Sequence, residues 1–382
     1  MSEPLIQLRR VKNLYAYWRD GQLFFYNFTR RLTVSGRPLT CEVLDFFGGW
    51  RTSQEAIAHF ADYSPSSVRS ALSQLVKQGL LLPKDSPELA QDNRIAKEWK
   101  TWLPEGSFHF STKDAPYADS HLRFAQWKSA LPKTRPPNIF KTVKGPKKRL
   151  PSRTIPDSEF IRVLMARKTH REFSNQELTF ENLSQLLSLV WGVTGYLHPA
   201  LFGKLLHKTS PSGGARHPGE VYVMALRVKG LRPGLYYYHP AHHYLKMINP
   251  NATPKKASLY CARQDHPRNA AALFIMTAVF GRTMWKYLHP RAYRVVLLDA
   301  GHLCQTFCLV ATWLGLAPFC TAALKDTLIE DDLGIDGIHE SVLYIAGVGL
   351  PAISARVKRQ FFRSADRRAR NPSKGGVREN HS

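Results

Sequence analysis

The first quarter of the chain carries two successive hydrophobic patterns. Apolar and polar residues alternate over residues 5–33 around an Asp-Gly turn, which predicts a small β-hairpin or meander. Apolar residues then recur at helical spacing and are followed by three leucines, which predicts three helices and a strand over residues 40–47, 53–61, 65–78 and 80–82. Thr52 with Glu55 forms a capping box, and Ser64 caps the third helix. This order is typical of a winged-helix module, placed at residues 1–95.

A different pattern, in which helices alternate with strands, begins at residue 151. Three helices are predicted, two amphipathic and one long and mostly apolar, over residues 158–168, 180–191 and 292–314. Strands are predicted over residues 220–228, 235–238, 270–280, 319–324 and 341–347. These elements indicate an α+β domain at 151–355, with a connector and basic Pro-rich linker at 96–150 and a basic tail at 356–382.

The composition is that of a folded, strongly basic chain. Its 382 residues include 54 Lys and Arg against 29 Asp and Glu, for a net charge of +25, and 43% are hydrophobic. This excludes a wholly disordered chain, and the charge favours an anionic partner. Much of the charge lies in the linker and the tail, where a solvated, flexible segment explains it equally well. Because the apolar runs are short and residues 1–10 carry no secretory signal, we expect a cytoplasmic protein without membrane contact.

Five cysteines occur without a CxxC pair, which favours reduced thiols over a disulfide framework. Cys304 and Cys308 lie one helical turn apart and could share a metal, but no second pair completes a tetrahedral site. Because cysteine is often buried, core packing is the favoured interpretation and no metal is assigned.

The third predicted helix decides between DNA and peptide as a partner of the N-terminal module. Its outer face carries Arg69 and Lys77, which could contact phosphate, but its other exposed positions are mostly serines. A sheet edge beside a helix also accepts an extended peptide as an added strand, and this needs no excess of charge. The sequence therefore favours peptide docking and disfavours nucleic acid.

Three further segments carry candidate chemistry, the first of them a cationic cluster at a predicted helix end. Guanidinium groups, an ammonium group and a hydroxyl together suit a phosphate monoester. A run of charged side chains exposed to solvent is the alternative. The cluster comprises Arg167, Lys168, Thr169 and Arg171.

The second segment is a turn of small residues that leads into a strand. Paired glycines let the backbone approach a flat ligand closely, and a nearby arginine could stabilise negative charge on it. An ordinary Gly-rich turn is the alternative. The residues are Ser210, Ser212, Gly213, Gly214 and Arg216.

The third segment pairs a lysine with a tyrosine. Lys286 and Tyr287 are adjacent acid/base candidates, since either side chain can move a proton when partly desolvated. Asp299 and His302 share a helical face and could form a hydrogen-bonded pair, although a core or interface role is the commoner explanation. The GVGLPA segment at 347–352 matches GxGxxA but opens no βαβ unit, so a Rossmann nicotinamide site is not supported.

Taken together, the segments RKTHREF, SPSGGARHP, MWKY, YRVVLLDAGH and VLYIAGVG resemble, in this order, the FMN-dependent nitroreductase superfamily and, more narrowly, its SagB-type dehydrogenases of ribosomal peptide maturation. The resemblance implies a nitroreductase-like mixed sheet flanked by helices, with FMN bound at a homodimer interface. Arg167, Lys168, Thr169 and Arg171 would hold the FMN phosphate, together with Arg356 after the last strand. The serines and glycines of the turn would face the ring system, with Thr321 and Ala322 near its N5 edge.

The same resemblance implies an activity. Lys286-Tyr287 matches the Lys-Tyr motif of members that oxidise thiazoline or oxazoline rings to azoles with dioxygen as acceptor, and Arg216 would stabilise reduced anionic flavin. The substrate would be a ribosomally made precursor peptide whose leader docks on the N-terminal module; a cyclodehydratase as a partner enzyme is left open. The usual Arg-Ser of the phosphate cluster reads Lys168-Thr169 here. Two alternatives stay open: an FMN-dependent reductase of dehydroamino-acid or nitro groups, and a flavin-binding, DNA-binding regulator.

Overall fold

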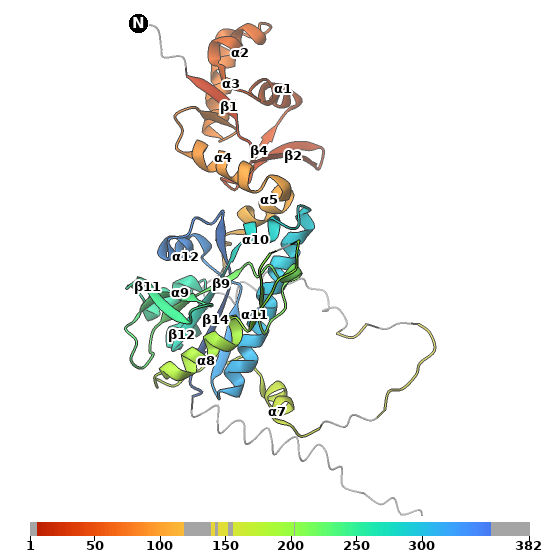
Figure 1. Cartoon of the computed structure of the whole chain (residues 1–382). Coiled ribbons are helices and arrows are strands. Elements are labelled where there is room, and N and C mark those ends of the chain that lie inside the picture. Colours follow the sequence, from red (N-terminus) through yellow and green to blue (C-terminus); the bar gives the residue numbers. More distant parts are fainter. Residues whose placement is uncertain (1–5, 118–138, 142–143, 152–155, 202, 353–382) are drawn as a thin grey trace, which may run out of the picture.

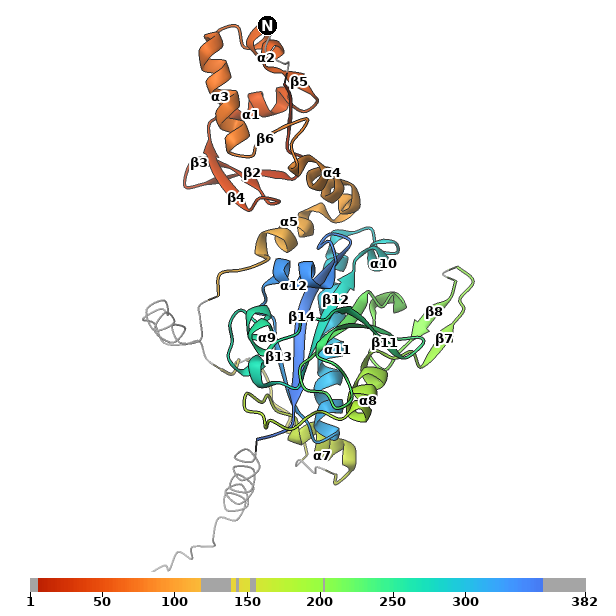
Figure 2. The same ribbon diagram turned by 90° about the vertical axis from the view of Figure 1, so that its left-hand side faces the viewer.

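The computed structural model describes residues 6–117, 139–141, 144–151, 156–201 and 203–352. A small N-terminal module and a larger domain lie end to end, with helices α4 and α5 between them (Figure 1). A view turned by 90° shows the same arrangement (Figure 2). Arg356, predicted as a phosphate ligand, lies outside the described residues, as do the basic tail and part of the linker.

The N-terminal module combines two small sheets with three helices. β2 (Leu14–Arg19), β3 (Gln22–Asn27) and β4 (Leu32–Gly36) form an antiparallel meander, while β1 (Gln7–Arg10) pairs with β5 (Arg51–Thr52) and β6 (Leu81–Pro83). The helices are α1 (Pro38–Phe46), α2 (Ser53–His59) and α3 (Pro65–Lys77). The predicted meander, three helices and closing strand are confirmed, together with the Thr52–Glu55 capping box and the Ser64 cap.

The connector is helical at its start. It contains α4 (Glu88–Glu98), a 3-10 turn (Lys100–Trp102) and α5 (Leu103–Thr112). Trp99 and Trp102 are completely buried, and they pack in one hydrophobic cluster with Phe28 of the module and Phe280 and Tyr293 of the large domain. The connector therefore joins the two bodies through a shared core; the exact domain boundaries stay a prediction.

His109 in this junction is expected to make the protein sensitive to acid. The imidazole stacks on Trp99 at 5.2 Å between ring centroids and hydrogen-bonds the Tyr293 hydroxyl at 3.0 Å. Burial lowers the pKa of His109 to about 3, and the charge of Lys113 lowers it further. The folded state thus requires the neutral ring, whereas in the unfolded chain the ring gains a proton below about pH 6.5. The free energy of unfolding therefore falls as pH drops below 6.5, with about 2 kcal/mol lost by pH 5.

Chemical unfolding at pH 7 and pH 5 measures this effect. His109→Gln should remove about 2 kcal/mol of the loss seen in the wild type, because glutamine does not titrate. The exposed His198 offers a matched control, His198→Gln, which should leave the loss unchanged. An identical pH dependence in His109→Gln and the wild type would show that His109 is not responsible.

The large domain is built on a six-stranded sheet in the order β11-β10-β9-β12-β14-β13. Its strands are β9 (Gly219–Ala225), β10 (Gly234–His239), β11 (Tyr244–Asn249), β12 (Ala272–Val279), β13 (Ala317–Thr321) and β14 (Glu340–Gly349). Alternate residues of the central strands face opposite sides. One face packs against α8 (Phe180–Trp191) and α11 (Tyr293–Trp313), the other against α9 (Pro254–Tyr260) and α12 (Asp326–Leu333).

The α+β class with a helix-flanked sheet is confirmed, with one difference. The sheet was expected to be mixed, but all five pairings among its described strands are antiparallel. The chain returns by hairpins or long excursions that reverse its direction, which leaves no parallel pair among the described strands of this sheet. A single parallel bridge, Leu178 with Val228, lies outside these strands. Apart from short 3-10 turns, the remaining described helices and strands are α7 (Glu159–Ala166), α10 (Gly281–Met284) and the hairpin of β7 (Gly195–Leu197) with β8 (Leu205–His207).

Helix α11 has a composition that would also suit a membrane. In the described residues, the stretch Pro290–Trp313 is the one helix long and apolar enough to span a bilayer by length and composition. One face of this helix packs on the sheet, which accounts for part of its apolar character. The opposite side exposes Leu297, Leu298 and Trp313. The expectation of no membrane contact stays a prediction.

Candidate functional site

The Gly-rich turn is fixed to helix α11 by a buried carboxylate. Ser212 Oγ donates to Asp299 Oδ2 at 2.5 Å, and the amide of Gly213 donates to Asp299 Oδ1 at 3.3 Å. Ser212 Oγ also accepts from the amide of His217 at 2.9 Å, and Ser210 Oγ lies 2.7 Å from Thr306 Oγ1. Burial raises the pKa of Asp299, and these hydrogen bonds counter part of that rise. The sequence offers His302 as one partner of Asp299, with a core or interface role as the commoner explanation; in the structure the carboxylate holds the turn.

Lys286 and Tyr287 reach the same turn from the other side. Gly214 has a φ of 62°, and a Cβ placed on it would lie 2.8 Å from Lys286 Nζ and would also overlap the Tyr287 hydroxyl. The ammonium lies 5.4 Å from the centre of the Tyr287 ring, and both side chains are half-buried. The structure thus brings together a predicted acid/base pair and a predicted ligand-binding turn that lie far apart in the sequence.

Arg216 connects this turn to α10. Its Nε donates to the carbonyl of Arg282 at 3.0 Å, and its guanidinium carbon lies 4.8 Å from the centre of the Trp285 ring. Arg282 in turn donates to the carbonyl of His217 at 3.1 Å and forms a 2.5 Å ion pair with Glu220. These contacts fix α10, and with it the start of the Lys-Tyr segment, against the turn.

Lys208 is a site residue that sequence reasoning missed. It is buried in a small cleft together with Ser210, Ser212, His217 and Asp299. Burial lowers the pKa of Lys208 to about 8, with Glu220 opposing the shift and Arg282 adding to it. Burial also lowers the pKa of His217 to about 4, helped by the charge of Lys208. The available signal was a lysine two residues before Ser210, which alone does not distinguish a buried group from a surface one.

The cationic cluster lies farther along α11. Arg167 follows the end of α7 and is half-buried, whereas Lys168, Thr169 and Arg171 are exposed. The amide of His170 donates to the carbonyl of Pro318 at 2.8 Å, which fixes the cluster to β13. The cluster and the turn therefore both lie along α11, the cluster on its β13 side and the turn at Asp299 and Thr306.

Of the two residues expected near the N5 edge, one is already hydrogen-bonded within the protein. Thr321 is buried at the end of β13, where its hydroxyl accepts from Gln264 Nε2 at 2.8 Å. Ala322 is exposed directly after it. Their role toward a cofactor stays a prediction.

Three cysteines converge beside this region. The Sγ atoms of Cys304, Cys308 and Cys320 lie within 4.8 Å of one another, from α11 and β13. A thiol trio is one ligand short of a tetrahedral site, although a soft metal could bind there. Cys304 and Cys308 are buried in the core beneath α11, in keeping with the packing role predicted for them.

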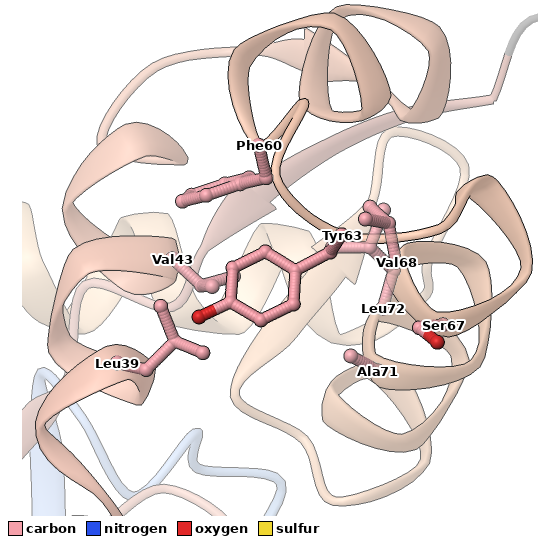
Figure 3. Close-up of a pocket in the computed structure, with 8 residues that line it drawn as sticks. All are labelled: Leu39, Val43, Phe60, Tyr63, Ser67, Val68, Ala71 and Leu72. Atoms are coloured by element: carbon pink, nitrogen blue, oxygen red, sulfur yellow. The ribbon is translucent and has the colours of Figure 1, made fainter.

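The N-terminal module contains a separate apolar pocket. The aromatic rings of Phe60 and Tyr63 and the aliphatic chains of Leu39, Val43 and Leu72 converge on one space (Figure 3). Ser67, Val68 and Ala71 of α3 complete the wall, and the cavity measures about 230 Å³ and is partly open to solvent. β4 lies at the edge of its sheet, paired only with β3 among the described strands. β4 leads into α1, which contributes Leu39 and Val43 to the pocket. An apolar pocket of this kind suits a peptide with large apolar side chains.

Comparison with known proteins places these features in a family. The model of the nitroreductase family matches residues 164–350, a range that holds the cationic cluster, the turn, the Lys-Tyr segment and α11. A protein of Methanocaldococcus jannaschii named as a nitroreductase, MJ1384, is 33% identical over 184 residues, which cover 47% of this chain and 88% of that protein.

Two relatives are named for processing peptides. The trifolitoxin-processing protein TfxB of Rhizobium leguminosarum bv. trifolii is 28% identical over 316 residues, which cover 77% of this chain and 82% of that protein. The microcin B17-processing protein McbC of Escherichia coli is 30% identical over 135 residues, which cover 33% of this chain and 48% of that protein. The similarity to TfxB extends well beyond the range of the family match at 164–350.

Proposed function

The chain belongs to the nitroreductase family, whose members are oxidoreductases that usually bind a flavin, and from this we propose that it is an FMN-dependent, SagB-type dehydrogenase of ribosomal peptide maturation. It would oxidise thiazoline or oxazoline rings to azoles, with dioxygen as the final acceptor. The observation that carries the proposal is the meeting of Lys286 Nζ and the Tyr287 hydroxyl at Gly214. The peptide-processing names of TfxB and McbC support the substrate class.

The residues present suit both ends of FMN, its phosphate and its ring system. Arg167, Lys168, Thr169 and Arg171 offer guanidinium, ammonium and hydroxyl donors that match a phosphate monoester. The missing side chain makes room for Val295 of α11 at Gly213 and for the ends of Lys286 and Tyr287 at Gly214. The backbone of this turn would face the flat ring. When bound, FMN would supply the two-electron acceptor for the reaction.

The protein's own residues would handle the proton. Converting an azoline to an azole removes one proton and one hydride, and Lys286 or Tyr287 would take the proton from the heterocycle. Asp299 holds the turn in place through Ser212 and Gly213, so that the ring and the base keep a fixed separation. Arg216, fixed by Arg282 and Trp285, would place positive charge beside the reduced ring.

Gly214→Ala tests the geometry of this site. At a φ of 62°, an alanine costs about 1 kcal/mol in backbone strain. Its Cβ would push aside only the flexible ends of Lys286 and Tyr287, so the stability cost should stay near that value. Turnover should fall at least about tenfold, because small displacements of reacting groups are costly.

Gly230→Ala is the matched control, since Gly230 has a φ of 76° and nothing within 4 Å of its would-be Cβ. It should show the same loss in the free energy of unfolding and unchanged turnover. Equal turnover in the two variants would mean that the contact at Gly214 has no catalytic role.

The leader of the precursor peptide would dock on the N-terminal module, at the apolar pocket and the β4 edge. Ala71→Glu places a charge at the exposed rim of the pocket on α3 and should weaken leader binding at least about tenfold, because a carboxylate would have to be desolvated there. Fluorescence anisotropy of a labelled leader peptide measures this. Ser70→Glu adds the same charge on an exposed neighbouring position outside the pocket and should bind normally. Normal binding by Ala71→Glu would exclude this pocket.

A homodimer is proposed for the same enzyme. Exposed apolar side chains lie on α7 and α11, at Phe160, Met165, Leu297, Leu298 and Trp313. Exposed apolar surface of this kind marks an interface between proteins. Sedimentation should therefore show a particle of two chains; a monomer that retains flavin would contradict this. A cyclodehydratase is a further proposed partner; the name of McbC supports the processing of a peptide and names no such enzyme.

The alternatives make different predictions. A reductase of dehydroamino-acid or nitro groups would consume reduced flavin and leave azoline peptides unchanged. A DNA-binding regulator would bind a specific duplex through α3 and show no oxidase activity. The apolar pocket beside α3 and the serines on that helix favour peptide over DNA.

A further inference from the structure

The Lys-Tyr segment receives part of its support from outside the family domain. It lies in the loop between β12 and α11, whose two ends, Phe280 and Tyr293, are both buried in the cluster that contains Trp99 and Trp102 of the connector. Phe28 of the N-terminal module is buried in the same cluster. A single core therefore joins the module, the connector and the loop that carries the proposed base.

One hydrogen bond within this core reaches the segment directly. Trp102 Nε1 donates to the carbonyl of Tyr287 at 2.9 Å, and Trp102 is completely buried. The amides of Lys286 and Tyr287 both donate to a local acceptor, the carbonyl of Thr283, at 3.2 and 3.0 Å. The connector therefore holds the backbone at the end of the segment, while α10 holds its start.

We propose that Trp102 is a positioning residue for Lys286 and Tyr287, an inference that rests on the function proposed above. A fixed Tyr287 carbonyl sets the direction in which the two side chains leave the backbone, and both side chains must end at Gly214. Without the indole donor, the carbonyl loses its buried partner and the loop turns to find another. The connector thus completes the active site of the domain that follows it.

Trp99 provides a matched comparison within the same cluster. Its Nε1 donates to the carbonyl of Ile338 at 3.0 Å, and it is also completely buried. Trp99→Phe and Trp102→Phe therefore each remove one buried indole donor and a similar ring volume. They differ in the backbone that loses its partner, because Ile338 lies outside the Lys-Tyr loop.

The test compares the two variants in the full-length, FMN-loaded protein. Amide hydrogen exchange followed by mass spectrometry should show at least tenfold faster exchange across residues 284–288 in Trp102→Phe and less than twofold change there in Trp99→Phe. With an azoline peptide, Trp102→Phe should lower kcat at least tenfold with KM and flavin content unchanged, and Trp99→Phe should keep kcat within twofold. If Trp102→Phe does not fold, benzothienylalanine at position 102 removes the donor and keeps the ring shape.

Each outcome bears on one claim. Equal exchange across 284–288 in the two variants, or equal loss of kcat, would overturn the positioning role of Trp102. Faster exchange in Trp102→Phe together with a wild type that oxidises no azoline would support the link to the loop and overturn the proposed reaction instead.

Discussion

Replacing Lys286 by alanine or Tyr287 by phenylalanine should lower azoline oxidation at least about 100-fold, because general acid–base catalysis typically contributes that much or more. Lys286 Nζ and the Tyr287 hydroxyl lie at the turn that we expect to face the flavin, where both would contact a Cβ placed on Gly214. Flavin content should stay at the wild-type level, since neither side chain belongs to the cationic cluster. Steady-state rates, followed by mass spectrometry of the peptide, measure the loss.

Arg291→Ala is the control for this pair. Arg291 is exposed in the same loop and should retain wild-type activity when truncated. If both Lys286→Ala and Tyr287→Phe keep full activity, another group takes the proton from the heterocycle and the assignment of the base is wrong. If only one of the two loses activity, that residue is the base.

The second large effect concerns cofactor retention. The double variant Arg167→Ala with Arg171→Ala should bind FMN at least about 100-fold more weakly, because each hydrogen bond to a charged group contributes about 1.5–3 kcal/mol. The visible absorption of the purified protein and the flavin released by heat measure retention directly. Turnover should recover in part when excess FMN is added, since the acid/base pair remains in place.

A control variant that removes the same number of positive charges elsewhere distinguishes the loss of specific phosphate contacts from a general loss of positive charge. Arg232→Ala with Lys246→Ala removes two exposed cations near β11, at the edge of the sheet opposite β13, where the cluster is fixed. It should retain flavin fully. Full retention by the Arg167 and Arg171 variant would remove the cluster from the cofactor site.

The parts of the site that sequence could predict are those encoded locally. The turn and the Lys-Tyr segment are short motifs whose residue types state their chemistry, so each was visible before the fold was known. Their meeting at Gly214 depends on how β9, α10 and α11 assemble, which no local pattern contains. Asp299 shows the same limit. A partner three residues away is visible in the sequence, whereas its actual partner, Ser212, lies 87 residues away.

In the fold, too, the predictable elements are those with a strong local sequence pattern. Helix α8 has the predicted bounds of 180–191, because Thr179 caps an amphipathic segment with a clear period. β11 was missed because this outer strand is largely exposed and lacks alternation, and α12 was missed because most of its residues are polar. Trp99 and Trp102 stood out as aromatics without a pattern, since their hydrogen-bond partners lie 239 and 185 positions later in the chain.

The most direct test of the central claim is to incubate the purified, FMN-loaded protein in air with an azoline-containing precursor peptide. Mass spectrometry then measures the mass of the peptide product. The proposed function predicts the loss of two hydrogens per ring, in wild type and not in Lys286→Ala. An FMN-loaded wild type that leaves every azoline unchanged, or a protein that takes up no FMN at all, would contradict it.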